Sequence, residues 1–545
     1  MFTIPVLLIP IFLGIVLVGM AKRTSAKTTS RKLPPGPRPW PLLGNILDLP
    51  PRGKPEWEHW LKHKDLYGPI SSVVAMGTTF IIVHSAELAF ELLERRSAIY
   101  SSRPRMVFVG EMCGWENVTA FLPYGEKLRA YRRRIFAVFG TKGTAARFFP
   151  LQENEVKRFL LNTLDTPQGF LDHIKSASGA IILKLTYGYS VKLHGEDPLV
   201  DLANKADEQV AMASVPGAWL VDTIPPLRYL PEWLPGSGFK TKAKEWKKTL
   251  SMLADQPLLF SKRQIADGSY EPSFVSSLYE AGSESKTEEE ESVVKWSAAS
   301  MYAAGADTSK NTITTFFLAM ILQPEIQKKA REEIDRVVGT KRLPTFDDRP
   351  YLPYIEAITM EAYRWHPVVP LGLPHMATAS DECNGCLIPK GAMVIPNIWW
   401  FTHDPELYHN PESFDPSRYM DPSSCRDPRD FVFGFGRRAC PGKLLADSTV
   451  WLTIACTLAV FDIGKPTSKT GEEIKPEAKF TPGLVSHTVA FDASIQPRSS
   501  DHEALIRKAA ASHPRGEGLG GMKIFLRRKE SELDADYARG GLFPI

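Results

Sequence analysis

Residues 433–442 of this 545-residue chain read Phe-Gly-Phe-Gly-Arg-Arg-Ala-Cys-Pro-Gly. An apolar run from Lys443 to Phe461 follows it and predicts a helix. A thiolate of Cys440 would then lie at a helix N-terminus, where free backbone N–H groups and the helix dipole stabilise negative charge. Arg437 and Arg438 are placed to bind anionic groups beside the sulfur. One thiolate with adjacent arginines suits a haem, because its iron accepts sulfur and its propionates bind arginine.

The spacing of five residues in this stretch resembles the haem-binding loop of the cytochrome P450 family. They are Phe433, Gly436, Arg438, Cys440 and Gly442. The resemblance implies that Cys440 is the axial ligand of the iron of heme b, with Arg438, Phe433, Gly434 and Gly436 around the cofactor. The alternative is a buried, inert cysteine capped by a glycine-rich turn.

The resemblance extends over residues 34–497 and implies the cytochrome P450 fold, which is mainly α with a small β-rich subdomain. Strand-like runs at 70–75 and 79–84 flank a turn, residues 86–322 have a mostly helical pattern, and a second strand-rich stretch covers 386–396. We expect a transmembrane anchor at 1–21, a basic and proline-rich linker at 22–50, a single catalytic domain at 51–498 and a flexible extension at 499–545. The acidic run at 288–291 is interpreted as a solvated linker.

The N-terminal segment has the features of a membrane anchor. Residues 2–21 carry no charged side chain and are long enough to span a bilayer as a helix. Lysines and arginines follow at 22–32, so the positive-inside rule predicts that the C-terminal part lies in the cytoplasm. The resemblance implies a single-pass protein of the endoplasmic reticulum membrane. A cleaved signal peptide is the alternative, but the segment lacks a preceding basic region.

The bulk composition argues against some other classes of protein. The 66 basic and 62 acidic residues are too evenly balanced for a nucleic-acid-binding protein. Six cysteines in 545 residues fit a reducing compartment. Cys383 and Cys386 form a lone Cys-x-x-Cys around Asn384-Gly385, which is a hairpin signal. We interpret this segment as a turn with incidental cysteines, and a metal or redox role is the alternative.

A second motif runs from Ala304 to Ser309 inside an apolar helical stretch, 296–322. Gly305 would let a flat cofactor approach the backbone, and the Thr308 hydroxyl can bond the carbonyl four residues back. An acid beside an alcohol in an apolar wall can relay protons. The resemblance implies that Asp307 and Thr308 are the catalytic pair that supplies protons during oxygen activation. A helix kink with a solvated aspartate is the alternative.

A third motif has a structural rather than a chemical role. Glu361 and Arg364 share one helix face three residues apart and can form an ion pair. The resemblance implies that Arg418, in Pro416-Ser417-Arg418-Tyr419, completes a buried triad with them. Such a triad serves folding and haem retention.

The resemblance also implies two contacts to the haem propionates, from Arg132 and from His375. Leu128 stands where the family usually has a tryptophan, so one propionate hydrogen bond is not expected here. The basic residues next to Arg132 are expected to contribute to a surface for an acidic electron donor. Arg134 is interpreted as part of a solvated helix face.

An apolar site for a hydrophobic small molecule is expected, with ordinary core packing as the alternative. By resemblance its lining comprises Met301, Ala304, Leu484, Val485 and the segments 106–121 and 368–373. The proline-rich segment 214–239 resembles the loop over the substrate channel in fungal members, or it forms a membrane-dipping surface patch.

Together these motifs indicate a monooxygenase that inserts one oxygen atom from O2 into a hydrophobic small molecule. The resemblance is greatest to fungal microsomal members of the O-methylsterigmatocystin oxidoreductase-like group, in secondary metabolism or xenobiotic oxidation. It implies electrons from NADPH through a separate NADPH-cytochrome P450 reductase, with cytochrome b5 as a second partner. Two alternatives stay open: a haem-thiolate isomerase or dehydratase that needs no reductase, and a haem-binding protein without turnover.

Overall fold

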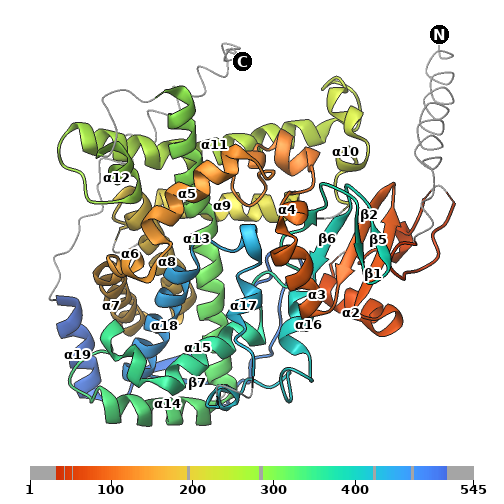
Figure 1. Cartoon of the computed structure of the whole chain (residues 1–545). Coiled ribbons are helices and arrows are strands. Elements are labelled where there is room, and N and C mark those ends of the chain that lie inside the picture. Colours follow the sequence, from red (N-terminus) through yellow and green to blue (C-terminus); the bar gives the residue numbers. More distant parts are fainter. Residues whose placement is uncertain are drawn as a thin grey trace.

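The computed structural model describes residues 32–511 except 42, 52, 193–196, 216, 281–286, 422–424 and 468–471. The described chain is mainly helical and carries a small β-rich lobe on one side (Figure 1). This architecture agrees with the expected fold class. The anchor expected at 1–21 lies outside the described residues.

The helical part is dominated by helices of more than ten residues. These are α2 (Glu56–Tyr67), α5 (Glu126–Phe139), α7 (Phe149–Asp165), α8 (Phe170–Tyr187), α9 (Pro198–Ala213), α11 (Gly238–Ala266), α13 (Glu288–Leu322), α14 (Pro324–Val337), α15 (Pro353–Trp365), α18 (Lys443–Val460) and α19 (Ser500–Ala511). Shorter helices are α3 (Ala86–Phe90), α4 (Ser97–Tyr100), α6 (Lys142–Ala146), α10 (Leu220–Thr223), α12 (Phe274–Glu280), α16 (Ile398–His403) and α17 (Arg429–Val432). Single turns of 3-10 helix are η1 (Ile46–Asp48), η4 (Trp115–Asn117), η5 (Pro167–Gly169), η6 (Pro225–Tyr229), η7 (Phe346–Tyr351), η8 (Pro416–Tyr419) and η9 (Gly436–Arg438), and π turns are η2 (Glu91–Arg95) and η3 (Val107–Met112).

The β lobe is built on a four-stranded sheet of order β1-β2-β6-β3. β1 (Ile70–Ala75) and β2 (Thr78–Val83) form an antiparallel hairpin, β2 runs parallel to β6 (Met393–Pro396), and β3 (His375–Met376) pairs antiparallel with β6. A second hairpin joins β4 (Asp381–Cys383) to β5 (Cys386–Ile388), with positive φ angles of 51° at Asn384 and 75° at Gly385. These angles fit the expected Asn-Gly turn. A third pair comprises β7 (Phe461–Gly464) and β8 (Ser494–Pro497).

α13 is the long helix that crosses the middle of the molecule (Figure 1). It begins at Glu288, so the acidic run 288–291 forms its first turn and is not the linker that we expected. Thr287 caps this end with Glu290 in a reciprocal capping box, and four glutamates there interact favourably with the helix dipole. The pattern of a threonine followed three residues later by a glutamate is a helix-start signal that the acidic composition obscured.

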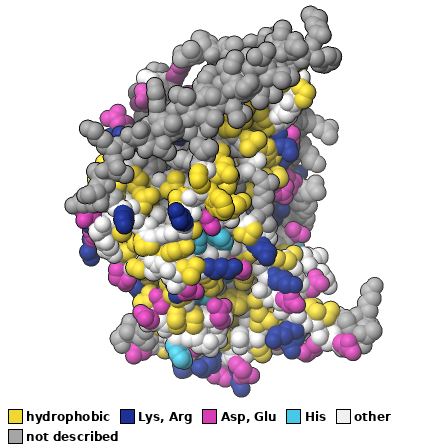
Figure 2. All heavy atoms as spheres, turned by 90° about the vertical axis from the view of Figure 1, so that its right-hand side faces the viewer, with side chains coloured by type: hydrophobic (Ala, Val, Ile, Leu, Met, Phe, Trp, Pro, Cys, Tyr) yellow, Lys and Arg dark blue, Asp and Glu magenta, His cyan; other side chains and the backbone are white. Residues whose placement is uncertain are grey.

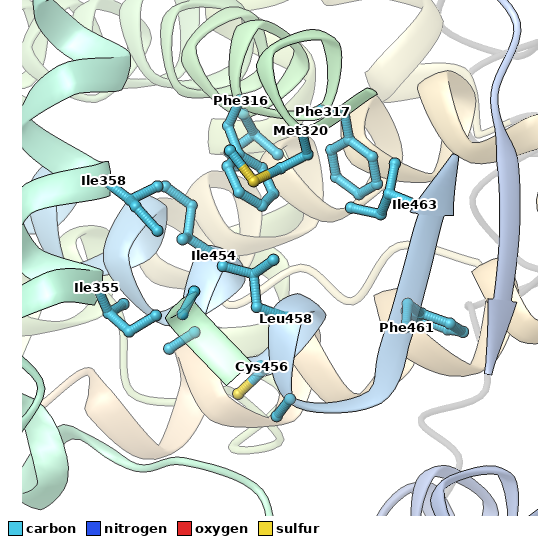
Figure 3. Packing of buried hydrophobic residues seen from close by; sticks show 14 of the residues in the cluster. Phe316, Phe317, Met320, Ile355, Ile358, Ile454, Cys456, Leu458, Phe461 and Ile463 are labelled. Carbon is cyan, nitrogen blue, oxygen red and sulfur yellow. The ribbon is translucent and has the colours of Figure 1, made fainter. Parts of the chain in front are cut away.

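One hydrophobic cluster joins α13, α15, α18 and β7 (Figure 3). Phe316 and Phe317 of α13 pack there with Ile358 of α15 and Leu458 of α18, all of them fully buried. Each such side chain contributes roughly 1.5–3 kcal/mol of stability. Among the described helices, α18 alone is long and apolar enough to cross a membrane, but it is largely buried in this core.

The proline-rich stretch after residue 32 is docked on the sheet. Ser72 of β1 donates from Oγ to the carbonyl of Pro34 (2.6 Å) and from its backbone N–H to the carbonyl of Pro35 (2.8 Å). The backbone N–H of Leu387 in β5 donates to the carbonyl of Lys32 (2.9 Å). A Cβ on Gly36 would lie 1.9 Å from the carbonyl oxygen of Ser72, so only glycine permits this approach.

The chain does not end its folded part near residue 498. α19 follows β8 directly and packs against α7, with Ile506 in the main core and Arg507 paired to Asp165 at 3.0 Å. The expected flexible extension is therefore wrong for residues 500–511. Residues 512–545 lie outside the described part of the chain.

Candidate functional site

The cysteine loop is folded by hydrogen bonds within itself and by glycines with positive φ. The backbone N–H of Cys440 donates to the carbonyl of Phe433 (2.7 Å), and φ is 72° at Gly434 and 50° at Gly436. A Cβ on Gly436 would lie 2.5 Å from the carbonyl oxygen of Leu93 in η2. Glycine is therefore required at position 436 both by conformation and by space.

Cys440 lies just before α18, as the sequence predicts. The side chain of Cys440 is solvent-accessible. Many protein atoms nevertheless lie near its sulfur, and the resulting loss of hydration raises the pKa of the thiol. The N–H of Gly442 and the positive charges of Arg132 and Lys443 act in the opposite direction. A cation bound to the sulfur would favour the thiolate over the thiol.

A group of cationic side chains lies around this loop and donates to backbone carbonyls. Arg438 donates to the carbonyls of Ser101 (2.5 Å), Thr119 (3.1 Å) and Leu122 (2.6 Å). Arg132 donates to the carbonyl of Ala439 (2.9 Å).

Arg103 joins this group, although we did not identify it from the sequence. It donates to the carbonyls of Ala120, Leu373 and Pro374 at 2.9–3.0 Å. No sequence signal distinguishes it from its exposed neighbour Arg105, because its contacts come from loops far away in the chain.

The three arginines repel one another, and this repulsion bears on whether a haem fits the site. Burial and the charge of Arg132 lower the pKa of Arg438 to about 10, and burial with the charges of Arg438 and Arg132 lowers that of Arg103. Among the described residues no Asp or Glu forms an ion pair with any of the three arginines. Buried positive charges without partners are costly, so the group requires an anionic ligand, and the two carboxylates of a haem fit it.

His375 lies beside these arginines in β3. Its Nδ1 is 2.7 Å from the carbonyl oxygen of Tyr100, and burial with the charge of Arg103 lowers the pKa of the ring far below its ordinary value. Leu128 on α5 is buried with Leu122 in a small apolar cluster and offers no polar contact. The structure thus places His375 beside the arginine group and leaves Leu128 outside it, and the contact of His375 with a propionate stays a prediction.

The α13 segment shows the expected hydroxyl-to-carbonyl bond, from Thr308 Oγ1 to the carbonyl of Ala304 (2.8 Å). Ala304 is exposed in a helix that is otherwise mostly buried. A side chain on Gly305 would project onto Ile182 of α8, at 2.8 Å. The observed reason for this glycine is therefore close packing of α13 on α8, and its contact with a cofactor stays a prediction.

Asp307 contacts two basic side chains. Its Oδ2 lies 2.6 Å from His487 Nε2, and its Oδ1 lies 2.6 Å from Lys310 Nζ. Burial alone would raise the pKa of this carboxyl, but the His487 hydrogen bond and the Lys310 charge outweigh it and hold the pKa well below its usual range. The aspartate is therefore half-buried and paired, which differs from the alternative of a solvated aspartate.

The predicted structural triad forms. Glu361 receives Arg364 Nε and Nη2 at 2.8 Å each, and Arg418 Nε at 3.2 Å. Arg364 also donates to the carbonyls of Thr402 and Ser413 at 2.9 Å. The charges are paired and their remaining donors are used, which is the condition under which a buried ion network is tolerated.

Several segments expected at the substrate site meet around α13. The backbone N–H of Thr119 donates to Ser300 Oγ of α13 (3.0 Å), and that of Ser486 donates to the carbonyl of Val368 (2.9 Å). Met301 is buried in the core cluster that also contains Phe108. Leu484 and Val485 are half-buried. The lining is thus assembled from loops and one helix that are distant in sequence.

This fold and this cysteine loop with its anion-binding group define a haem-thiolate protein. A family model described as Cytochrome P450 matches residues 34–492, and the chain belongs to this family. The chain is 46% identical over 484 residues to cytochrome P450 monooxygenase claR of Ampulloclitocybe clavipes, which covers 88% of this chain and 89% of that protein. It is 44% identical over 487 residues to cytochrome P450 monooxygenase ppsD of Aspergillus oryzae, covering 88% and 92%.

Two further similarities agree with the predicted group and fold. The chain is 39% identical over 498 residues to O-methylsterigmatocystin oxidoreductase of Aspergillus flavus, covering 91% of this chain and 93% of that protein. A zebra fish cytochrome P450 structure with abiraterone superposes with a TM-score of 0.65 at 24% identity, covering 82% of this chain and all of that one. The chain is accordingly a haem-thiolate monooxygenase, an oxidoreductase that uses haem and O2 and receives electrons from a redox partner.

Proposed function

We propose that this monooxygenase hydroxylates or epoxidises a hydrophobic small molecule with electrons that NADPH-cytochrome P450 reductase transfers from NADPH. The observation that carries the proposal is the group of Arg103, Arg132, Arg438 and His375 beside Cys440, which is suited to a haem. Haem with a sulfur ligand supplies the activation of O2. Cys440 holds the iron, and the cationic group orients the propionates.

On the side of α13, Asp307 and Thr308 relay from water the protons that the reaction consumes. The hydroxyl of Thr308 donates to the carbonyl of Ala304, and the carboxylate of Asp307 contacts His487. The apolar segments around Met301 and Val368 exclude water and orient the substrate.

The protein is proposed to act in fungal secondary metabolism or xenobiotic oxidation, at the endoplasmic reticulum membrane with the catalytic domain in the cytoplasm. The charge-free residues 2–21 support an anchor. Apolar side chains are also exposed on the described surface: Trp40, Leu47, Leu220, Tyr229 and Trp233. Figure 2 shows hydrophobic side chains gathered in the upper part of the face on which Figure 1 places α10 and the sheet.

A basic surface supports docking of the electron donor. Arg437 is exposed and bonded to the hydroxyl of Tyr124 at 3.1 Å, and Arg129 lies over the same ring. Both belong to elements that flank the cysteine loop, so an acidic reductase surface bound there lies near the haem. Cytochrome b5 is a second donor for the same surface.

The proposal is tested on purified holoprotein. The ferrous carbonyl adduct should show the red-shifted Soret band of sulfur ligation, and Cys440→Ser should abolish it. With reductase and NADPH, a screen of hydrophobic compounds that includes O-methylsterigmatocystin should reveal an oxygenated product. A wild-type protein without this band contradicts the proposal, and product formed without NADPH supports a reductase-independent isomerase or dehydratase.

A further inference from the structure

α13 holds the loop 481–488 through a ladder of three residues spaced by four. Asp307, Asn311 and Thr315 lie on one face of the helix, because residues four apart are neighbours on its surface. Each of them bonds to the loop. Together they fasten a segment that lies far beyond the end of the helix in the sequence.

Each of the three helix residues has a hydrogen-bond partner in the loop. His487 Nε2 lies 2.6 Å from Asp307 Oδ2. The amide of Asn311 donates to the carbonyl of Ser486 and accepts from the N–H of Thr488 at 3.0 Å. The hydroxyls of Thr315 and Thr488 are 2.9 Å apart.

The same loop carries Leu484 and Val485, which are expected to touch the substrate. Ser486 in addition bonds to the carbonyl of Val368 and, through Oγ, to His366 Nε2 at 2.8 Å. The loop therefore connects the substrate side of the site to Asp307 over a distance of two residues, from Val485 to His487.

The charged and titratable groups around Asp307 show which contact can change. They are His487 of the loop, Lys310 of α13, Asp207 of α9 and Lys175 of α8, with His366 next to His487. Lys310 is on the same helix as Asp307 and moves with it. His487 is on a loop and is the partner that can withdraw.

Neither oxygen of Asp307 is bonded to Thr308 in this arrangement. One oxygen is held by His487 and the other by Lys310, while the Thr308 hydroxyl donates to Ala304. For Asp307 to take a proton from water and pass it to Thr308, one of its two contacts has to open. The contact that can open is the one between Asp307 and His487, because His487 lies on the loop whereas Lys310 lies on the same helix as Asp307.

We propose that His487 is a positioning residue that couples occupancy of the substrate site to proton delivery. While the loop is docked, His487 holds Asp307 away from Thr308. A substrate that displaces Leu484 and Val485 withdraws His487 and frees the aspartate. This inference rests on the proposed function, because it assigns Asp307 and Thr308 to the proton path.

The first test measures the contact itself by amide hydrogen exchange in the holoprotein, without turnover. His487→Ala should increase exchange at residues 484–488 about tenfold, the ratio that corresponds to about 1.4 kcal/mol and to the loss of one hydrogen bond to a charged group. His487→Gln keeps a donor and should restore most of the protection. Unchanged exchange in His487→Ala contradicts the proposal.

The second test measures NADPH oxidation by the holoprotein and reductase without substrate. His487→Ala should raise this rate by at least about threefold, because the freed acid supplies protons in the absence of substrate. The matched control is Thr315→Val, which loosens the same loop without touching Asp307 and should raise the rate much less. In His487→Ala combined with Asp307→Asn the rise should disappear.

Equal rises in His487→Ala and Thr315→Val, or a rise that persists in the double variant, overturn the proposal. The ferrous carbonyl band is recorded for every variant. A wild-type protein without the band contradicts the proposed function, whereas a wild-type protein with the band and a negative outcome above contradicts only the role of His487.

Discussion

Glu361 and Arg364 lie one turn apart on α15 and form a bidentate ion pair whose two side chains have no exposed surface. The backbone N–H of Asp415 and the side chain of Arg418 add two further bonds to the same carboxylate. The pair thus joins α15 to η8 and to the segment that leads toward the cysteine loop. It is a junction of the fold rather than a part of the reaction.

Replacing Glu361 by Ala should remove the counter-charge of the buried Arg364 guanidinium and destabilise the protein by roughly 3–5 kcal/mol. Denaturant unfolding of the holoprotein measures this loss. Arg507→Ala, which removes two exposed pairs with Glu503 and Asp165, is the control and should change the midpoint little. Similar midpoints for both variants would show that the buried pair is unimportant for folding.

Replacing Arg438 by Gln should weaken haem retention, because Arg438 is buried and its three carbonyl partners would lose their donor. The rate of haem loss to a haem-scavenging protein should rise about tenfold or more. The adjacent Arg437→Gln is the matched control, since this side chain is exposed. Equal rates of loss for the two variants would contradict the role of the buried arginine.

Replacing Gly436 by Ala should prevent correct closure of the cysteine loop. The alanine would adopt a φ of 50°, with its Cβ 2.5 Å from a backbone oxygen of η2. Strain of this kind costs about 1–3 kcal/mol before any displacement of η2. Gly442→Ala meets only Cys440 Sγ at 3.9 Å and should fold normally. The yield of holoprotein and its unfolding midpoint distinguish the two, and a stable Gly436→Ala protein would contradict the argument.

Replacing Thr308 by Ala should uncouple NADPH consumption from product formation. The change removes the hydroxyl beside Asp307 while leaving the helix in place. Thr314→Ala is the control, because Thr314 makes the same kind of bond. Its Oγ1 donates to the carbonyl of Lys310, four residues back, at 2.9 Å. The ratio of product to NADPH should fall several-fold in the first variant only. Unchanged coupling in Thr308→Ala would remove this residue from the proton path.

Acidification should destabilise the fold between about pH 6.5 and pH 4 through buried histidines. Burial lowers the pKa of His84 and of His366 to about 3 and that of His63 to about 4. Below pH 6.5 these side chains bind protons in the unfolded chain but not in the folded one, so stability falls as the pH falls. Each contributes up to about 1.4 kcal/mol per pH unit.

Unfolding midpoints at pH 7.5, 6.0 and 5.0 measure this dependence. His84→Asn should give a shallower decline with pH than the wild type, because one proton-linked group is gone. A midpoint that does not change between pH 7 and pH 5 would contradict the prediction.

The sequence predicted the parts of the site that depend on spacing within one short segment. The loop around Cys440, the pair of Glu361 and Arg364, and the bond from Thr308 to Ala304 are determined by neighbours in the chain, so a motif identifies them. Arg103 and His487 escaped prediction because their partners are brought to them by the tertiary fold. The residues next to Arg103 and His487 in the sequence do not indicate those contacts.

Boundaries were less predictable than motifs. The acidic run at 288–291 looked like a solvated linker by composition, yet its glutamates are favourable at a helix N-terminus. Likewise the polar composition after residue 499 obscured the apolar face of α19, on which Ile506 packs into the core. In both places a few specific positions decided the structure and average polarity did not.

The docking of residues 32–36 on the sheet restricts how the catalytic domain can turn relative to the chain that precedes residue 32. A free tether would permit every orientation, whereas bonds from Ser72 to Pro34 and Pro35 hold the first described residues in one direction. Any surface that binds the chain before residue 32 will therefore face the side of the domain on which residues 32–36 lie. Lengthening the chain before residue 32 would change the distance to that surface and leave the docked stretch as it is.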